Sequence, residues 1–335
     1  MKASHLFSYF TLFFLLISCK NEVKQNDYFN ATSEDNIKVG GVKMVTIDTP
    51  KGKFKVWTKR IGNNPKIKLL LLTGGPGLSH EYLECVESFL PKEGIEFIYY
   101  DQLGTGFSEN PNDTTMWDLP RYVEEVEQVR KALNLDKDNF FLLGHSWGGI
   151  LGMQYALKYQ SNMKGLIVSN MMASCPKYGE YSKVLEKQMN PEVLKVIKDL
   201  EAKKDYSNPK YMDLLMNNFY NQHILRKPVN EWPEPVNRAM GKINSSLYIT
   251  MQGPSELGIS GKLTNWDVSS QLPSVTIPTL VIGAKYDTMD PEYMKWMSTQ
   301  FKKGTYLYCS NGSHMCMYDD QETYFKGLID FLKKE

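Results

Sequence analysis

The chain alternates between short apolar runs and longer segments that have one apolar face. Apolar runs that end at glycine or other turn-forming residues are typical of strands buried on both faces of a parallel sheet. Such runs occupy residues 67–72, 96–100, 139–143, 165–169, 279–283 and 305–309. Segments with the apolar spacing of a helix lie at 81–90, 121–133, 150–159 and 321–333. The alternation predicts an α/β fold with a mainly parallel, doubly wound sheet.

Two regions depart from this alternation. Residues 42–49 and 53–60 are rich in β-forming residues and flank a Pro-Lys-Gly turn, which predicts a hairpin. Residues 171–266 contain helical stretches and proline-rich joints but no buried-strand run. We therefore expect an α/β core formed by residues 37–170 and 267–335, with a helical cap inserted at 171–266.

The start of the chain has the pattern of an export signal. An apolar run from Leu6 to Ile17 ends just before Cys19. The run is shorter than the roughly 20 residues of a membrane-spanning helix and fits a signal peptide. Because the stretch that ends at Cys19 resembles a bacterial lipoprotein box, we expect residues 1–19 to be a lipoprotein-type signal, with lipid on Cys19. Residues 20–36 are polar and predict a flexible tether.

This pattern predicts an exported protein that its lipid anchors to a membrane, in the periplasm or the cell envelope. An ordinary secretory signal and a retained membrane anchor are the alternatives. The charge of the chain excludes a different class of partner. Lys and Arg number 39 against 38 Asp and Glu, and this balance argues against binding to nucleic acid.

The cysteines do not predict a metal site. Beyond Cys19 they are Cys85, Cys175, Cys309 and Cys316, and their spacing fits no zinc pattern. In an exported protein Cys309 and Cys316 could form a disulfide, whereas two buried free thiols would fit the sequence equally well. Both alternatives stay open at this point.

Residues 144–148 carry the clearest chemical signal. They read Gly-His-Ser-Trp-Gly, and they follow a predicted strand and open a predicted helix. G-x-S-x-G in this context is a nucleophile elbow, a sharp turn that exposes the Oγ atom of Ser146. Glycine is needed at both flanks because a Cβ atom there would collide with the tight backbone. Ser146 is therefore the candidate nucleophile, and a purely structural turn is the alternative.

A serine nucleophile needs a base, and the base needs a carboxylate to orient it. In folds with this elbow the chain order is serine, acid, histidine. His314 follows a late predicted strand and precedes the last helix, where the base is expected. Asp287 follows the strand at 279–283 and is the candidate acid. Asp290 is a weaker candidate because the proline after it predicts a helix start, where aspartate is a common cap.

Acyl transfer also requires hydrogen-bond donors for the developing oxyanion. Residues 73–77 read Thr-Gly-Gly-Pro-Gly after a predicted strand. The backbone N–H groups of Gly75 and Trp147 are the expected donors. A phosphate-binding loop is a weaker interpretation because neither G-x-G-x-x-G nor a G-K-[ST] ending is present. These residues together predict a serine hydrolase.

Four motifs resemble those of proline iminopeptidases (prolyl aminopeptidases). They are GGPG at 74–77, DQLGTGFS at 101–108, GHSWGG at 144–149 and GSH at 312–314, and the similarity runs from about Val42 to the C-terminus. The resemblance implies an α/β-hydrolase fold with a helical cap. It also implies a serine exopeptidase that releases N-terminal proline, or another small residue, from peptides through an acyl-enzyme. Such an enzyme needs no metal or cofactor.

The resemblance also bears on single residues. Members of the family bind the substrate amine with a cap glutamate, and Glu256 occupies the matching motif position. Where a second acid is used it follows the triad aspartate directly, but Thr288 stands there in this sequence. Asp290 could take its place. Thr73 replaces the usual first residue of an HGGPG motif, which makes the substrate preference less secure.

Two further activities remain possible from the sequence. One is an esterase or amidase of the same fold with another pocket, and the other is a non-catalytic binding lipoprotein. The indole of Trp147 could form the floor of a proline pocket or pack beneath the elbow. Tyr220, Trp232 and Trp266 are expected in the core of the cap.

Overall fold

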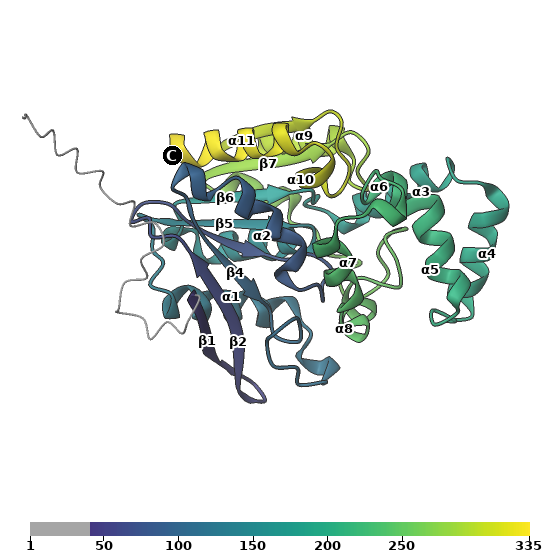
Figure 1. The fold of residues 1–335 in the computed structure, drawn as a ribbon, viewed down its shortest axis with the longest axis horizontal. Coiled ribbons are helices and arrows are strands. Elements are labelled where there is room, and N and C mark those ends of the chain that lie inside the picture. Colours follow the sequence, from purple (N-terminus) through teal and green to yellow (C-terminus); the bar gives the residue numbers. More distant parts are fainter. Residues whose placement is uncertain (1–40) are drawn as a thin grey trace, which may run out of the picture.

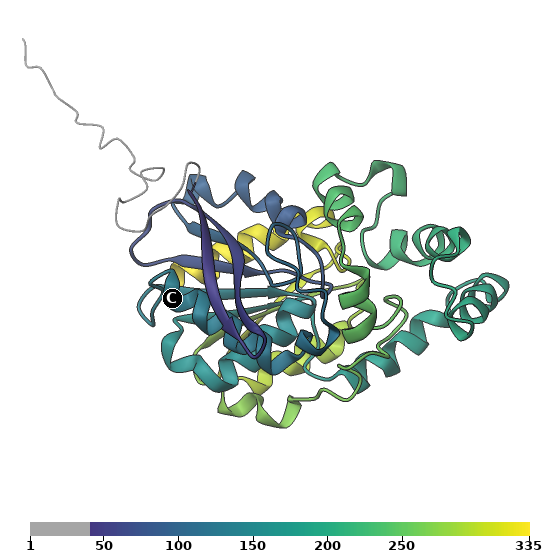
Figure 2. The same ribbon diagram turned by 90° about the horizontal axis from the view of Figure 1, so that it is seen from below.

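A mainly parallel sheet forms the centre of the protein, and helices cover both of its faces (Figures 1 and 2). The computed structural model describes residues 41–335. The predicted signal peptide, the tether and the lipidation of Cys19 lie outside this range. Within it, eight strands stand in the order β1-β2-β4-β3-β5-β6-β7-β8. The first two pairings, β1 with β2 and β2 with β4, are antiparallel, and every other pairing is parallel. The predicted fold class is thus confirmed.

The strands lie close to the apolar runs of the sequence. Their bounds are β1 (Val42–Thr49), β2 (Gly52–Ile61), β3 (Lys68–Leu72), β4 (Glu96–Asp101), β5 (Phe140–His145), β6 (Gly165–Ser169), β7 (Pro278–Ala284) and β8 (Lys303–Cys309). Successive side chains of a strand point to opposite faces. Leu70 and Leu72 of β3 accordingly join one apolar cluster, whereas Leu69 and Leu71 join the other. The runs of β3 to β7 are continuous because a strand buried on both faces cannot show a polar–apolar alternation, whereas β8, at the edge of the sheet, is mostly exposed or half-buried.

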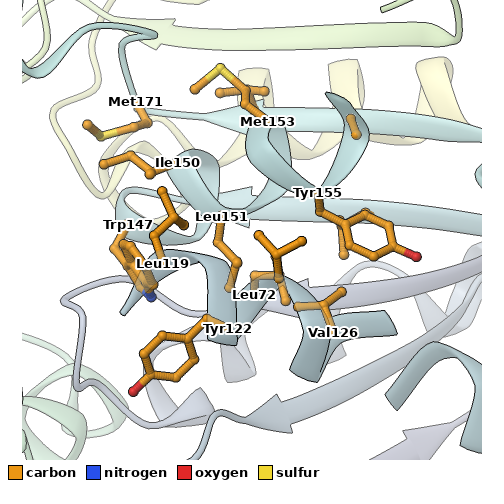
Figure 3. Close-up of a cluster of buried hydrophobic side chains, with 14 of the residues drawn as sticks. Leu72, Leu119, Tyr122, Val126, Trp147, Ile150, Leu151, Met153, Tyr155 and Met171 are labelled. Carbon is orange, nitrogen blue, oxygen red and sulfur yellow. The ribbon is translucent and has the colours of Figure 1, made fainter. Parts of the chain in front are cut away.

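The two clusters show which helices cover each face. The first cluster includes side chains of α1 (Leu119–Ala132), α2 (Trp147–Tyr159) and α9 (Pro291–Gln300). Figure 3 shows its centre, where Leu72 packs with Val126 and Leu151. The second cluster includes side chains of η4 (His80–Ser88), α10 (Cys316–Asp319) and α11 (Gln321–Lys334). It also takes in cap side chains such as Leu215 and Phe219, so the cap and this face of the sheet share one apolar core.

The segment predicted as a helix at 81–90 is a 3-10 helix, η4. In this conformation residues three apart lie above one another. Glu81 and Glu84 accordingly both bind Arg238 of the cap, at 3.0 and 2.8 Å. Lys242 adds a second ion pair to Glu81 at 2.6 Å. The 3-10 geometry thus presents two carboxylates to the same arginine.

The chain between β6 and β7 forms six α-helices within the described residues. They are α3 (Cys175–Glu186), α4 (Pro191–Ala202), α5 (Pro209–Leu215), α6 (Asn221–His223), α7 (Glu234–Gly241) and α8 (Ser245–Met251). Asn190 and Asn208 each precede a proline, and their side chains cap α4 and α5 by accepting backbone N–H groups. In Figure 1, α3, α4 and α5 lie at the far right, and α7 and α8 stand between them and the sheet.

Short helical turns complete the fold. The 3-10 turns are Pro91–Glu93, Thr114–Met116, Gln160–Asn162, Val229–Glu231 and Ser269–Ser274, and a π-helical turn spans Met216–Tyr220. In residues 41–335, none of the helices combines the length and the apolar character needed to cross a membrane.

Candidate active site

Ser146 stands in the strained turn between β5 and α2. Its backbone has φ 55° and ψ −125°, a conformation that is rare for a residue with a side chain. A Cβ atom on Gly144 would lie 1.9 Å from the carbonyl oxygen of Gly148, and one on Gly148 would lie 2.4 Å from that of Leu72. The steric reason for glycine at both flanks is therefore confirmed. The sharp turn at Ser146 can form because Gly144 and Gly148 have no Cβ atoms that would collide with the neighbouring backbone.

His314 and Asp287 lie together, beyond the ends of β8 and β7. The Nδ1 atom of His314 is 2.7 Å from Oδ1 of Asp287, and both side chains are buried. A carboxylate can only accept, so Nδ1 carries the proton and Nε2 is left free to act as a base. Burial alone would lower the pKa of His314, but the negative charge and hydrogen bond of Asp287 outweigh it and raise the pKa above 6.5.

Asp290, the weaker candidate, has another task. Its side chain caps α9 by accepting the backbone N–H of Glu292 at 3.0 Å. This is the capping role that the following proline predicted. Thr288, at the position where a second acid could follow the triad aspartate, places its hydroxyl 3.3 Å from Oδ1 of Asp287.

Asn170 binds Oδ2 of Asp287, the carboxylate oxygen that does not face His314, and the sequence did not predict this role. It follows β6 directly, is fully buried, and has φ 55°. Its Nδ2 atom donates to Oδ2 of Asp287 at 2.7 Å and to the carbonyl of Ser313 at 3.3 Å. Its Oδ1 atom accepts from the hydroxyl of Ser169 at 2.8 Å. A polar residue directly after a buried parallel strand was the signal that could have identified it.

The loop after β3 carries Gly75, one of the two expected oxyanion donors. Gly75 has φ 104°, in the region that favours glycine, and it borders the same cavity as Ser146. Gln102 connects this loop to the elbow. Its amide nitrogen lies 3.3 Å from the carbonyl and the hydroxyl of Thr73, and its oxygen accepts the indole N–H of Trp147 at 2.8 Å. The glutamine of the DQ motif therefore fixes the spacing between the two segments that carry the expected oxyanion donors.

The indole of Trp147 packs beneath the elbow. Its exposed fraction is 2%, and its ring meets the ring of Tyr122 edge to face at 5.6 Å. Figure 3 shows it in the apolar cluster beside Leu119 and Ile150. Trp147 is not among the residues that line the cavity at Ser146, so its side chain does not form the floor of a pocket there.

Ser146 and His314 open onto a cavity of about 660 Å³ between the core and the cap. Its walls are largely apolar and include Met212, Met216, Tyr220, Trp232, Met240 and Ile249. Tyr220 and Trp232 therefore form part of a wall, although the sequence placed them only in the cap core. Trp266 does not line the cavity, and its indole N–H donates to Gln154 at 3.1 Å. The volume lies within the 300–1,000 Å³ that is usual for small-molecule sites.

Glu256 is the only carboxylate among the described residues that line this cavity. It is half-buried, and the hydroxyls of Tyr178 and Tyr248 donate to its two oxygens. Burial and then the charge of Glu256 raise the pKa of both tyrosines, so their hydroxyls stay protonated. The hydroxyl of Tyr220 accepts the backbone N–H of Glu256 at 3.1 Å. Within residues 41–335 no lysine, arginine or histidine forms an ion pair with Glu256. Asp290, the suggested second acid, does not line the cavity.

The cysteines near the site are free thiols. Cys309 and Cys316 are both fully buried and are not bridged. The thiol of Cys316 donates to Oδ1 of Asn170 at 3.3 Å. Burial raises the pKa of Cys316 well above its usual value, which keeps it a protonated donor at neutral pH. Of the two alternatives for this pair, the structure shows the free thiols.

Comparison with known proteins agrees with this geometry. Residues 68–321 match the family model described as the alpha/beta hydrolase fold. A protein of Flavobacterium johnsoniae named proline iminopeptidase is 61% identical over 290 residues, which cover 86% of this chain and 97% of that protein. One of the same name from Chitinophaga pinensis is 57% identical over 292 residues, or 87% of this chain and 98% of that protein.

A solved structure of a protein with the same name is also similar to this chain. The crystal structure of a proline iminopeptidase from Mycobacterium smegmatis superposes with a TM-score of 0.76 at 26% sequence identity, and it covers 88% of this chain and 98% of its own. The elbow, the residues at the strand ends and the inserted cap are thus accompanied by high sequence identity over most of the chain. This chain belongs to the proline iminopeptidase family of α/β hydrolases.

Proposed function

We propose that this protein is a serine exopeptidase that releases N-terminal proline from peptides. The observation that carries the proposal is the position of Glu256. Its carboxylate has no cationic partner among the described residues and borders the same cavity as Ser146 and His314. Charged groups that are taken out of water are normally paired, so a partly buried carboxylate without a cation fits a substrate ammonium group. The names of the relatives support the same substrate.

The first half of the reaction forms an acyl-enzyme. The Nε2 atom of His314 takes the proton of Ser146 Oγ, which attacks the carbonyl of the first residue. Asp287 stabilises the imidazolium ion that results, at its distance of 2.7 Å. The backbone N–H groups of Gly75 and Trp147 bind the oxyanion. The imidazolium then gives its proton to the leaving amine, and the shortened peptide departs.

The second half repeats these steps with water. His314 takes a proton from a water molecule, which attacks the ester at Ser146, and the amino acid leaves. These steps need only the side chains and backbone groups named above. A cap carboxylate that binds the free amine would position the first residue with its carbonyl at Ser146, so one residue is released at a time.

One assay separates this function from its alternatives. We would compare proline-anilide, alanine-anilide, N-blocked proline-anilide and a short-chain ester, with wild type and Ser146→Ala. The expected result is turnover of proline-anilide, much weaker turnover of the N-blocked compound, and loss of both in Ser146→Ala.

Two outcomes would contradict the proposal in different ways. Strong turnover of the ester or the N-blocked compound, without turnover of proline-anilide, would indicate an esterase or amidase. Activity that survives Ser146→Ala would refute the serine mechanism. Failure of all four substrates, together with no labelling of Ser146 by a fluorophosphonate, would favour a non-catalytic binding lipoprotein.

We also propose that the protein is exported and anchored by lipid at Cys19, in the periplasm or cell envelope. The support is the sequence of residues 1–19, with its apolar run that ends at the cysteine. A fatty-acid analogue fed to bacteria that produce the full chain should label the wild type and the control Cys85→Ala, but not Cys19→Ala. Label that persists in Cys19→Ala would refute the anchor.

A further inference from the structure

His145 is a buried titratable residue that the reaction above does not use. It lies directly before the nucleophile, and its exposed fraction is 1%. Its Nδ1 atom lies 3.0 Å from the hydroxyl of Tyr82, and its Nε2 atom lies 2.9 Å from the backbone carbonyl of His314. The same hydroxyl accepts the backbone N–H of Gly74 at 2.7 Å. The side chain of His145 thus connects the elbow to two loops. One is the glycine-rich loop at residues 73–77, called the oxyanion loop, and the other is the loop that carries His314.

The protons in this chain of hydrogen bonds can have only one arrangement. The carbonyl of His314 can only accept, so Nε2 of His145 carries the proton, and a neutral imidazole has only one. The hydroxyl of Tyr82, which accepts the N–H of Gly74, therefore donates its own proton to Nδ1. Every group in the chain is satisfied only when His145 is neutral.

The surroundings of His145 also favour the neutral form. Burial, and then the nearby His314, lower the pKa of His145 to about 3. The ring centroids of the two histidines are 4.9 Å apart. The other titratable groups that face His145 are Tyr82 of η4, whose pKa is raised by burial, and Asp287 beyond β7. When His314 becomes charged during the reaction, a second charge on His145 would oppose it.

We propose that His145, as the neutral Nε2–H tautomer, is a positioning residue. Through Tyr82 it fixes the loop at residues 73–77 relative to Ser146, and through its own Nε2–H it fixes the loop that carries His314. The inference rests on the serine mechanism proposed above. Tyr82 does not line the cavity, and His145 borders it with an exposed fraction of only 1%. The oxyanion loop also approaches the nucleophile closely, because a Cβ atom on Gly74 would lie 3.0 Å from the Cβ atom of Ser146. Small shifts of this loop therefore reach the nucleophile directly.

The first test is Tyr82→Phe, which keeps the ring and removes only the hydroxyl. We expect kcat for proline-anilide to fall about tenfold to a hundredfold, with KM changed less than about twofold, because only the relative position of donors and base is disturbed. The acid limb of the pH profile should not move, since Asp287 still sets the pKa of His314. The matched control is Tyr155→Phe, which removes a buried hydroxyl that bonds Glu127 at 2.7 Å, away from the site.

The second test compares His145→Gln with His145→Phe. A glutamine amide can still donate to the carbonyl of His314, so it should retain more kcat than phenylalanine at the same position. We expect the same order, with His145→Gln faster than His145→Phe, in the rate at which a fluorophosphonate labels Ser146. This rate measures the reactivity of the serine without any peptide substrate. That readout separates this inference from the choice of substrate, because a wild type that labels but does not cleave proline-anilide would refute only the latter.

Two results would overturn the proposal. One is a Tyr82→Phe variant whose kcat matches that of Tyr155→Phe. The other is a His145→Gln variant no more active than His145→Phe when both melt at the same temperature. If Tyr82→Phe fails to fold, the His145 pair decides alone.

Discussion

In the core each candidate catalytic residue follows a strand, whereas the surroundings of Glu256 in the cap are assembled by side chains from separate helices. Ser146 and Asn170 come directly after β5 and β6, and Asp287 and His314 lie shortly after β7 and β8. Glu256 lies in a loop, and its partners Tyr178 and Tyr248 come from α3 and α8. The carboxyl ends of parallel strands meet at one edge, so the first arrangement follows from topology. The second depends on how helices pack.

The largest effect on the core side of this comparison is expected from removing the charge of Asp287, which orients His314. In Asp287→Asn we expect kcat to fall about 10⁴-fold, because the amide can stabilise the wrong tautomer of His314 and cannot stabilise its charged form. KM should change little, since Glu256 and the cap are untouched. Steady-state kinetics with proline-anilide will measure both constants. A loss in KM alone would mean that Asp287 contributes to binding instead.

The pH dependence tests the same group without a mutation. His314 must be neutral to accept the proton of Ser146, and its pKa is raised above 6.5 by Asp287. Activity is therefore present above that raised pKa and falls about tenfold per pH unit below it. The acid limb of kcat/KM should lie above pH 6.5. A limb below pH 6 in the wild type would contradict the coupling of His314 to Asp287.

The cap side of the comparison is tested by Glu256→Gln. We expect KM for proline-anilide to rise about tenfold to a hundredfold, because a hydrogen bond between charged groups is lost. The turnover of a simple ester should stay the same. Glu192→Gln, an exposed cap glutamate, is the matched control. An equal effect on the ester would show that Glu256 supports the cap rather than the substrate amine.

A smaller effect is expected at Asn170. Asn170→Gly keeps a residue that tolerates φ 55° and removes the amide that binds Asp287. We expect the free energy of unfolding to fall by about 1–3 kcal/mol because a buried carboxylate oxygen loses a donor. A fall of roughly tenfold in kcat should accompany it through the looser acid. Urea unfolding and kinetics will measure the two; unchanged kcat would remove Asn170 from the catalytic arrangement.

The smallest effect concerns the ion pairs that join cap and core. Arg238→Gln loses contacts with Glu81 and Glu84 but leaves Lys242 beside Glu81. The expected loss of stability is about 1 kcal/mol or less, since Arg238 is partly exposed. Lys195→Gln breaks an exposed pair within α4 and serves as the control, with no change expected in the melting temperature. A large change in KM from Arg238→Gln would indicate that these pairs also set the position of Glu256.

Sequence patterns predicted the strands of the sheet and the elbow because both depend on local features. A continuous apolar run specifies a buried strand, and the two glycines around Ser146 specify the turn. Asn170 carries only the weaker signal of a polar residue directly after a buried strand, and Tyr82 carries none, since the roles of both come from contacts with residues far away in the chain. The position of Glu256 was predicted only through resemblance to a family. Its tyrosine partners were missed because helix packing in the cap leaves no periodic signal that identifies them.

The shared apolar cluster of the cap and the η4 face of the sheet limits how this protein can be altered. Trimming the segment between β6 and β7 would remove side chains such as Leu215 and Phe219 from this cluster, and the η4 face of the sheet would lose part of its cover. The two parts are therefore expected to unfold in a single cooperative transition. Selectivity can be changed by replacing side chains that face the cavity, but the part of the chain that carries Glu256 cannot be detached from the part that carries Ser146.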